Sequence, residues 1–324
     1  MIIAGIDEAG YGPLLGPLAS AACAFRTADD SADPSAVPCL WERLRKCVGR
    51  SRSKDGRKLH INDSKAVYTP SAGLAELERA VLCLSGQVHG STDSLDAFLA
   101  KVDPDVGRML ATYPWYAPGE ADPFPIAVPA MSLRIASNGY TAVSADADTA
   151  CVHYRVRLLP ERQFNDHTAK TRNKASTLFG LAAQHLDDLL RTFADQNLLI
   201  VCDRQGGRSH YGLLLRLMFE DWALTVVSES DARSEYVLTN GPRRARLIFQ
   251  EKAEAECMAV AAASMLAKYA REALMKRFNR YWRNHDASLK PTAGYYTDGL
   301  RFLKDIEPLR ERLGIADVDL IRQR

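Results

Sequence analysis

The chain has 324 residues, of which 47% are hydrophobic and 25% are charged, a composition typical of a soluble globular protein rather than a disordered one. No apolar run approaches the roughly 20 residues needed to cross a bilayer, and the N-terminus carries no basic leader, so we expect a cytoplasmic protein without membrane contact. The formal net charge of +2 is too small to indicate a polyanion partner by itself, and seven scattered cysteines without a Cys-x-x-Cys pair argue against zinc and disulfides.

Apolar periodicity predicts strands that alternate with helices, which indicates an α/β or α+β layered fold. The expected elements are two strands within 1–27, helices over 38–50, 70–84 and 166–195, a buried strand at 198–203, a helix around 208–221, an apolar segment at 223–229, a hairpin turn at Asn240 and Gly241, and a long helix through 259–278. The stretch from about 86 to 162 contains a segment dense in proline and aromatic residues and is interpreted as an insertion. We expect a single domain over 1–324 that ends in a helical segment at about 273–324.

Four acidic residues stand at the ends of expected elements. Asp7 and Glu8 follow the first strand. Asp203 follows the apolar run LLIVC, and Glu254 lies just ahead of the alanine-rich helix. Clustered carboxylates repel one another unless cations neutralise them, and hard oxygen ligands favour Mg²⁺ or Mn²⁺. Two such ions about 4 Å apart stabilise both the attacking and the leaving oxygen in phosphodiester cleavage.

The same positions also allow a purely structural explanation of these acids. Asp7 would cap a turn, Asp203 would begin a loop, and Glu254 would be one of several exposed acids at a helix start. Spacing alone does not decide between a metal site and these local roles, because the pattern of acids at element ends is the same in both.

Five sequence blocks occur along the chain in a fixed order. They are GIDEAGYGPLLGPLASAA at 5–22, NDSK at 62–65, VCDRQG at 201–206, KAEAECMAVAAASMLAKYARE at 252–272 and GYYT at 294–297. Together they resemble the type 2 ribonuclease H family, whose members are ribonucleases HII and HIII. The resemblance implies an α/β fold of the ribonuclease H type, a mixed β-sheet flanked by helices. It also implies hydrolysis of the RNA strand in RNA/DNA hybrids, dependent on Mg²⁺ or Mn²⁺, which leaves a 3′-hydroxyl and a 5′-phosphate.

By the same resemblance, the catalytic and metal-binding acids are those already singled out, namely Asp7, Glu8, Asp203 and Glu254. The implied partner is an RNA/DNA hybrid or duplex DNA that contains ribonucleotides, and we expect a monomer. The family commonly has an aspartate at the fourth position, whereas Glu254 is one methylene longer. Glutamate is also a competent oxygen ligand, so the site is expected to remain functional.

The resemblance further assigns substrate binding to Gly10, Tyr11, Gly12, Asn62, Ser64, Lys65 and Tyr295. Ribonuclease HII has arginine between the two glycines, and its tripeptide helps to read the ribose 2′-hydroxyl at a junction. Tyr11 lacks that charge, so we expect continuous hybrids to be cut better than an isolated ribonucleotide. Ser64 and Lys65 follow a tight Asn-Asp turn and suit an anion. Tyr295 matches the family tyrosine that stacks on a deoxyribose.

Two basic segments are candidates for contact with the nucleic-acid backbone. One is the run of Lys and Arg within 50–58, which is otherwise a solvated loop. The other is 276–285, where arginines interleave with aromatic residues. In this second segment we expect the rings in the core and the arginines facing DNA.

Two other classes of protein remain open on the sequence. GIDEAGYG faintly resembles the first phosphate loop of sugar kinases and actin-like ATPases, but that reading needs a second glycine-rich nucleotide loop, and VCDRQGG is a poor candidate for it. The other class is a non-catalytic protein that binds hybrids, in which Tyr11 and Glu254 report lost activity. Incubation with a labelled hybrid, with and without Mg²⁺, separates the three classes.

Overall fold

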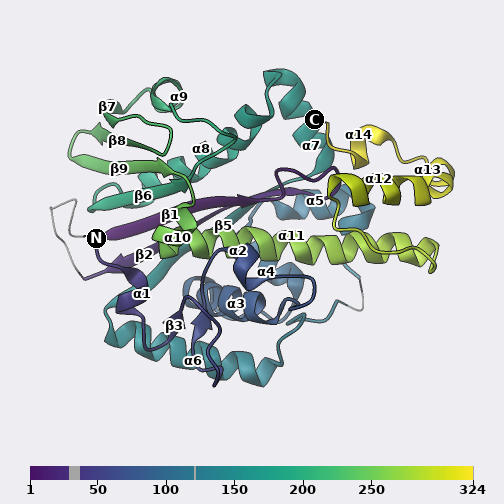
Figure 1. Cartoon of the computed structure of the whole chain (residues 1–324), viewed down its shortest axis with the longest axis horizontal. Helices are drawn as coiled ribbons and strands as arrows, with labels where there is room; N and C mark the ends of the chain where they lie inside the picture. The colour runs from purple at the N-terminus through teal and green to yellow at the C-terminus, as the bar shows by residue number, and fades with distance from the viewer. Residues whose placement is uncertain (29–36, 120–121, 324) are drawn as a thin grey trace.

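The computed structural model describes residues 1–28, 37–119 and 122–323 (Figure 1). The strands are β1 Ile2–Ala9, β2 Leu18–Thr27, β3 Val48–Gly49, β4 Leu59–His60, β5 Thr149–Leu159, β6 Leu198–Asp203, β7 Ala223–Ser228, β8 Arg233–Asn240 and β9 Arg243–Gln250. The α-helices are α1 Leu40–Arg43, α2 Ser64–Val67, α3 Ala75–His89, α4 Leu95–Val102, α5 Val106–Thr112, α6 Ala130–Asp146, α7 Glu161–Thr171, α8 Lys174–Phe193, α9 Gly212–Met218, α10 Ala253–Glu256, α11 Met258–His285, α12 Tyr296–Asp305, α13 Glu307–Leu313 and α14 Asp317–Leu320, with a 3₁₀ turn η1 at Pro114–Tyr116.

Seven strands form one mixed sheet in the order β5-β2-β1-β6-β9-β8-β7. The central strand β1 pairs with β2 in antiparallel fashion and with β6 in parallel fashion, and β6 is also parallel to β9. The predicted mixed sheet flanked by helices is therefore confirmed. Because β1, β6 and β9 run in the same direction, the residues that follow them emerge at the same edge of the sheet.

The two faces of the sheet bury different side chains, as the period of two in a strand requires. In β2, Ala19, Ala21 and Cys23 pack in the core that contains α11, whereas Ala22 and Ala24 pack in the core that contains α8. A helix therefore covers each face, and Figure 1 shows α11 crossing the sheet on the side nearer the viewer. Burial on both faces explains why β1 and β2 read as nearly continuous apolar runs.

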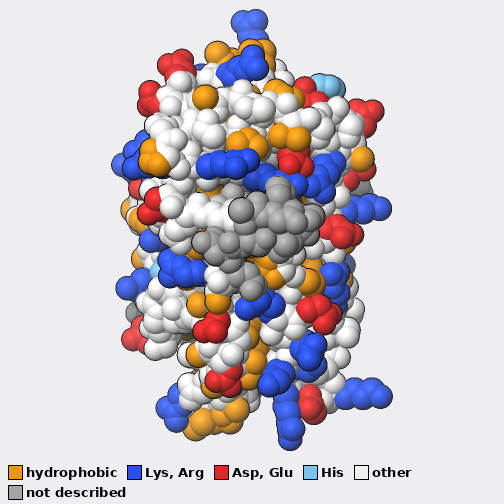
Figure 2. Space-filling model, turned by 90° about the vertical axis from the view of Figure 1, so that its left-hand side faces the viewer, with side chains coloured by type: hydrophobic (Ala, Val, Ile, Leu, Met, Phe, Trp, Pro, Cys, Tyr) orange, Lys and Arg blue, Asp and Glu red, His pale blue; other side chains and the backbone are white. Residues whose placement is uncertain are grey.

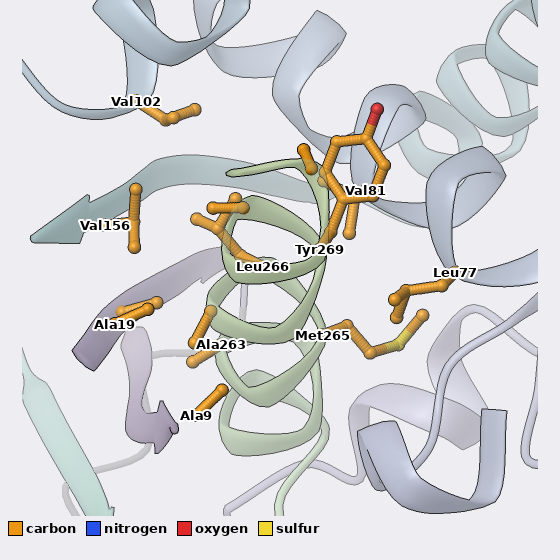
Figure 3. Packing of buried hydrophobic residues seen from close by; sticks show 14 of the residues in the cluster. Ala9, Ala19, Leu77, Val81, Val102, Val156, Ala263, Met265, Leu266 and Tyr269 are labelled. Carbon is orange, nitrogen blue, oxygen red and sulfur yellow. The ribbon is translucent and has the colours of Figure 1, made fainter. Parts of the chain in front are cut away.

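Helix α11 lies unusually close to β1 because one residue of the strand has no side chain. A Cβ added to Gly5 would meet the backbone nitrogen of Val260 at 2.1 Å. Alanines then line the contact, and Figure 3 shows Ala263 of the helix facing Ala9 and Ala19 of the strands. Met265, Leu266 and Tyr269 follow on the same helix. This close contact sets where the start of α11, and the acid-bearing α10 before it, meet the sheet.

Most predicted elements are confirmed, and four differ. The helix expected over 70–84 lies five residues later, at Ala75–His89. The helix expected over 38–50 was wrong beyond Leu40–Arg43, because the chain turns and Val48 then pairs with Leu59 in a small parallel sheet. The helix expected over 166–195 is two helices, since Arg172 has a left-handed φ of 50° and Asn173 caps α8. The helix around 208–221 is confined to Gly212–Met218.

The segment at 86–162 holds α4, α5, η1, α6 and the edge strand β5 of the main sheet, which the sequence did not predict. Its status as an insertion stays a prediction, as does the assignment of a single domain with a helical end. Within the described residues, none of the helices is both long and apolar enough to span a membrane.

Candidate functional site

Four predicted acids converge where parallel strands end. Asp7 and Glu8 lie within β1, directly before its last residue, and Asp203 is the last residue of β6. The Oδ1 atom of Asp203 accepts a hydrogen bond of 3.1 Å from the backbone N–H of Ala253, the first residue of α10. Glu254 is the next residue, so this bond carries it to the end of β6.

Burial and the charges of neighbouring acids raise the pKa values of three of these residues. Burial raises the pKa of Asp7 well above its usual range, and the charges of Glu8 and Asp203 add to the rise. Burial also raises the pKa of Glu8 to about 7, with Asp203 and Glu254 contributing. For Asp203, burial raises the pKa to about 6, the N–H of Ala253 opposes the rise, and Glu254 adds to it. The pKa of Asp7, of Glu8 and of Asp203 is therefore raised by at least one neighbouring acid of the group, as like charges in one site require.

Two carboxylate oxygens in this group have the character of open ligand positions. Glu8 Oε2 and Glu254 Oε2 are buried and have no hydrogen-bond partner among the described residues. A buried acceptor without a donor is costly, and a cation removes that cost. The donor set is all oxygen, which fits Mg²⁺ or Mn²⁺ held by Asp7, Glu8, Asp203 and Glu254. In the described part of the chain, no three or more Asp, Glu, His or Cys side chains are arranged so that they could hold a metal ion.

Two of the four acids also make hydrogen bonds with the backbone. Asp7 Oδ1 accepts a hydrogen bond of 2.7 Å from the backbone N–H of Glu8, and Asp203 Oδ1 accepts the bond of 3.1 Å from the backbone N–H of Ala253. These bonds use one oxygen of each carboxylate. They do not explain the convergence of four acids, which costs repulsion that a local cap would not need.

The NDSK segment contributes one cation to the acids. Burial disfavours the charged form of Lys65, but the charges of Asp63, Asp7, Glu254 and Asp203 raise its pKa. The side chain of Ser64 instead accepts a hydrogen bond of 2.9 Å from Ser264 of α11. Lys65 is thus the residue of this segment whose charge reaches the site.

Asn62 has a structural part in the same segment. Its Nδ2 donates to the carbonyl of Arg50 at 2.8 Å, and its Oδ1 accepts from the N–H of Asp63. Arg50 in turn stacks on Trp41 and donates to the carbonyl of Ala255 in α10. The chain therefore uses Arg50 to join the 50–58 loop to the helix that carries Glu254.

The Gly10–Gly12 tripeptide directly follows the acids of β1, and its two glycines have different surroundings. Gly10 has a φ of 86°, and an added Cβ would meet Arg271 Nε at 2.6 Å, so packing requires glycine there. Around a Cβ added to Gly12, no heavy atom of the described residues lies within 4 Å. Gly12 therefore faces open space, which leaves room for a ligand to approach the backbone.

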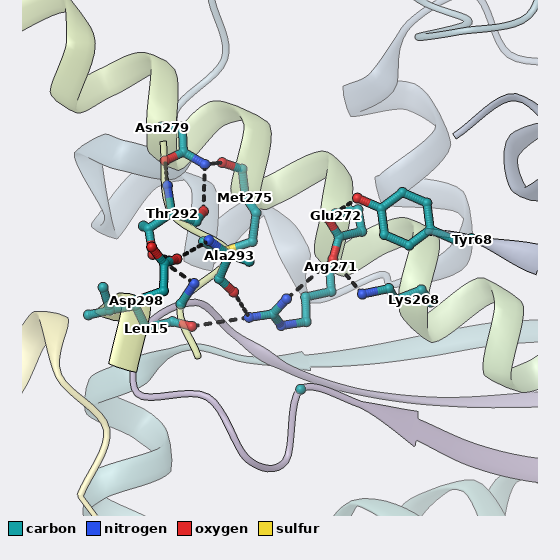
Figure 4. A network of polar contacts seen from close by, with 12 residues as sticks. Leu15, Tyr68, Lys268, Arg271, Glu272, Met275, Asn279, Thr292, Ala293 and Asp298 are labelled. Atoms are coloured by element: carbon teal, nitrogen blue, oxygen red, sulfur yellow. Dashed lines mark hydrogen bonds and ion pairs between the residues drawn. The ribbon is translucent and has the colours of Figure 1, made fainter. Parts of the chain in front are cut away.

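Two buried arginines, Arg271 and Arg322, donate hydrogen bonds to backbone carbonyls of the glycine-rich loop. The sequence did not indicate this role for either of them. Arg271 donates to the carbonyl oxygens of Leu15 at 3.2 Å and Ala293 at 3.0 Å, as Figure 4 shows. Arg322 donates through Nε to the carbonyl of Pro13 at 3.1 Å. A buried arginine is costly unless its donors are used, so these contacts rigidify the loop. The only sequence signal was the position of Arg271 inside the KYARE block.

Tyr295 lies beside that loop with its side chain 50% exposed. The preceding carbonyl, of Gly294, accepts hydrogen bonds from the backbone N–H groups of Leu14 and Leu15 at 2.8 and 3.2 Å. The Arg271 guanidinium stands 5.8 Å from the Tyr295 ring centroid. An exposed aromatic face is thus held next to the tripeptide.

The arginines of 276–285 correct one expectation. Arg277 is buried and forms ion pairs of 2.8 Å with Asp96 and with Asp122, and Arg280 also pairs with Asp122. These two side chains fasten α11 to its neighbours instead of facing DNA. On the face in Figure 2, Lys and Arg are interspersed with Asp and Glu.

The fold and the acids thus define an α/β protein with an acid-lined site at the ends of parallel strands. No protein-family model matches the chain, and no curated protein matches it.

Several solved structures of ribonucleases H are similar to the chain. The Archaeoglobus fulgidus PCNA:RNase HII complex matches with 15% identity and a TM-score of 0.43, over 100% of this chain and 95% of that chain. Ribonuclease H2 from Pyrococcus horikoshii OT3 matches with 16% identity and a TM-score of 0.46, over 99% and 92%. Bst-RNase HIII in complex with Mn²⁺ matches with 13% identity and a TM-score of 0.44, over 99% and 66%. At these identities and TM-scores the likeness carries no argument about function, so the function of this chain is inferred from its own residues.

Proposed function

We propose that the chain is a metal-dependent endonuclease that hydrolyses the RNA strand of RNA/DNA hybrids and leaves 5′-phosphomonoesters. The observation that carries this proposal is the convergence of four acids with two buried, unpartnered carboxylate oxygens, Glu8 Oε2 and Glu254 Oε2. The five sequence blocks that resemble type 2 ribonucleases H supply the substrate class. The domain assignment and the monomeric state remain predictions beside it.

The residues divide the work by their chemistry. Bound divalent ions would activate a water molecule and stabilise the leaving oxygen. The carboxylates of Asp7 and Asp203 are fixed by hydrogen bonds from backbone N–H groups. The longer side chains of Glu8 and Glu254 each have one carboxylate oxygen without a hydrogen-bond partner among the described residues. Lys65 adds a positive charge where the phosphodiester would meet four acids.

Recognition of the strand is proposed for the loop side of the site. Gly12 faces open space, so a ribose can approach the backbone there and its 2′-hydroxyl can be read by peptide groups. Tyr295 offers a ring face for the neighbouring sugar. Tyr11, which precedes Gly12 in the chain, adds a neutral side chain with one hydroxyl.

The test is cleavage of a hybrid whose RNA strand carries a 5′ fluorophore, with Mg²⁺, with Mn²⁺ or with EDTA. We expect cleavage within the RNA strand in either metal, no cleavage in EDTA, and none by Asp7→Asn purified in parallel. Binding of the hybrid without cleavage in any metal would support the non-catalytic alternative. Phosphate release from ATP would support the phosphotransferase alternative. Equal cleavage by the parent and Asp7→Asn would contradict the assignment of Asp7 to the catalytic site.

A further inference from the structure

Tyr11 is surrounded by side chains from parts of the chain far from the glycine-rich loop. Lys174, the first residue of α8, places its Nζ 4.5 Å from the centroid of the Tyr11 ring. A Cβ added to Gly206 would lie 3.5 Å from the Tyr11 hydroxyl, so the loop between β6 and α9 passes next to that hydroxyl. This loop begins directly after Asp203, and it therefore joins the acids to the surroundings of Tyr11.

Arg208 lies in the same loop and adds a second positive charge. Burial raises the pKa of the Tyr11 hydroxyl, the Glu8 charge adds to the rise, and the Arg208 charge opposes it. The hydroxyl therefore lies in the fields of both an acid of the site and this guanidinium. Two cations, Lys174 and Arg208, thus flank the edge of the acid cluster at Tyr11.

The Arg208 guanidinium lies against aromatic rings, and one of its nitrogen atoms has no hydrogen-bond acceptor within the described residues. It stands 5.5 Å from the ring centroid of Phe179 and 5.9 Å from that of Tyr211. Rings orient a guanidinium but do not satisfy its N–H groups as oxygen acceptors do. Arg208 Nη1 is buried and has no hydrogen-bond partner within the described part of the chain. A ligand oxygen at this position would supply the missing acceptor.

The backbone N–H groups at the start of α8, beside Lys174, already have a hydrogen-bond acceptor. Asn173 Oδ1 accepts hydrogen bonds from the backbone N–H groups of Ala175 at 2.9 Å and Ser176 at 3.4 Å. These are donors that a helix N-terminus would otherwise present to an anion. Binding at this place thus depends on the two cationic side chains and not on the helix itself.

We propose that Lys174 and Arg208, positioned beside Tyr11, form a binding site for a backbone phosphate of the nucleic acid next to the catalytic acids. A phosphodiester that approaches four carboxylates is repelled, and two cations on one flank offset that repulsion for the strand that must enter. The nature of the polyanion rests on the proposed function. The site itself does not depend on cleavage, because phosphate contact precedes chemistry.

The test is binding of a fluorescent hybrid and of a DNA duplex of the same sequence, measured by anisotropy in EDTA over a series of salt concentrations. The variants are Lys174→Gln, Lys174→Arg and Arg208→Gln. The matched control is Arg191→Gln, an exposed cation on the same helix about 26 Å away. Thermal unfolding of each variant is measured beside it.

We expect Lys174→Gln and Arg208→Gln each to weaken binding several-fold and to reduce the slope of log K against log salt by about 1, the amount for one lost phosphate contact. Lys174→Arg and Arg191→Gln should keep the parent slope. Parent slopes in both Gln variants would overturn the site, as would a parent that binds neither duplex. Should Arg208→Gln unfold, Lys174→Gln and its rescue by arginine decide the question. A parent that binds with these slopes but cuts no hybrid would refute the catalytic proposal and leave the phosphate site standing.

Discussion

The carboxylate of Asp203 and the backbone N–H of Ala253 share a hydrogen bond of 3.1 Å that joins the end of β6 to the start of α10. The bond sets which acid of the EKAEAE segment enters the site. Glu254 follows Ala253 and lies in the field of Asp203, whereas Glu256 is exposed and lines a separate 290 Å³ cavity with Arg233 and Gln250.

Two substitutions of Asp203 are expected to separate its effect on stability from its effect on cleavage. Asp203→Asn keeps a carbonyl oxygen for the N–H of Ala253 and loses the charge, so cleavage should be abolished while metal-free stability is kept. Asp203→Ala loses the hydrogen bond as well and should be less stable than Asp203→Asn by about 1 kcal/mol. Hybrid cleavage and urea unfolding in EDTA measure the two effects. Near-normal turnover of Asp203→Asn would remove Asp203 from the catalytic site.

Glu254 is expected to be the fourth acid, and Glu256 is its matched control. Glu254→Gln should lose most cleavage, because an amide offers a weaker oxygen ligand without charge. Glu254→Asp should keep measurable activity with an altered preference between Mg²⁺ and Mn²⁺, since only reach is lost. Glu256→Gln should cleave like the parent. Metal titrations of cleavage rate check all three, and the opposite ranking of the two Gln variants would exchange the roles of Glu254 and Glu256.

The glycines Gly5 and Gly12 are expected to respond in opposite ways to an added methyl group. Gly5→Ala forces α11 away from β1 because the Cβ would stand 2.1 Å from Val260 N, and overpacking of this kind costs about 1–3 kcal/mol. Gly12→Ala has open space and should change the free energy of unfolding by less than about 0.5 kcal/mol. Its cleavage of hybrids should nevertheless fall, because the methyl group enters the space proposed for the ribose. An active Gly12→Ala enzyme would place the sugar elsewhere.

Tyr11→Arg is expected to shift substrate choice towards an isolated ribonucleotide in DNA. The new guanidinium would add a charged donor next to the 2′-hydroxyl, where tyrosine offers one hydroxyl. It would also repel Lys174, whose Nζ now lies over the Tyr11 ring. The measurement is the ratio of cleavage rates on a continuous hybrid and on a duplex with one ribonucleotide, for parent and variant in the same salt and metal. An unchanged ratio would show that residue 11 does not set the preference.

His185 is expected to make the fold less stable as the pH falls. Its ring is fully buried with Nε2 3.0 Å from the carbonyl oxygen of Ser20, and burial lowers its pKa from 6.5 to about 3. Between these values the unfolded chain binds a proton that the folded chain does not. The stabilisation is therefore complete above about pH 6.5 and is lost progressively towards pH 3, at up to about 1.4 kcal/mol per pH unit.

The measurement for His185 is urea unfolding at about pH 7 and about pH 5 for the parent and for His185→Gln. The variant has no titrating ring, so its free energy of unfolding should fall less between the two values. The difference between the two proteins isolates this residue from Glu161, whose pKa is raised by burial to about 7 and whose contribution runs the opposite way. Equal losses in both proteins would show that His185 is not the titrating group.

The sequence by itself determined the elements whose pattern is local. Alternating or continuous apolar runs predicted β1, β2 and β6, the Asn240–Gly241 pair predicted the β8–β9 hairpin, and the alanine-rich run predicted α11. It also placed acids at element ends. These features depend on backbone periodicity and turn chemistry, which residues close in sequence determine.

Tertiary structure alone decided the contacts between distant segments. The pairing of Val48 with Leu59 ended the helix expected over 38–50, because long-range strand pairing overrides local propensity. The hydrogen bond from Arg322 to the carbonyl of Pro13 joins residues 309 positions apart, so residues close in sequence cannot predict it. Lys174 and Arg208 come close to Tyr11 for the same reason, since the three segments are separated by up to 197 positions (208 − 11) and approach one another only in the folded chain.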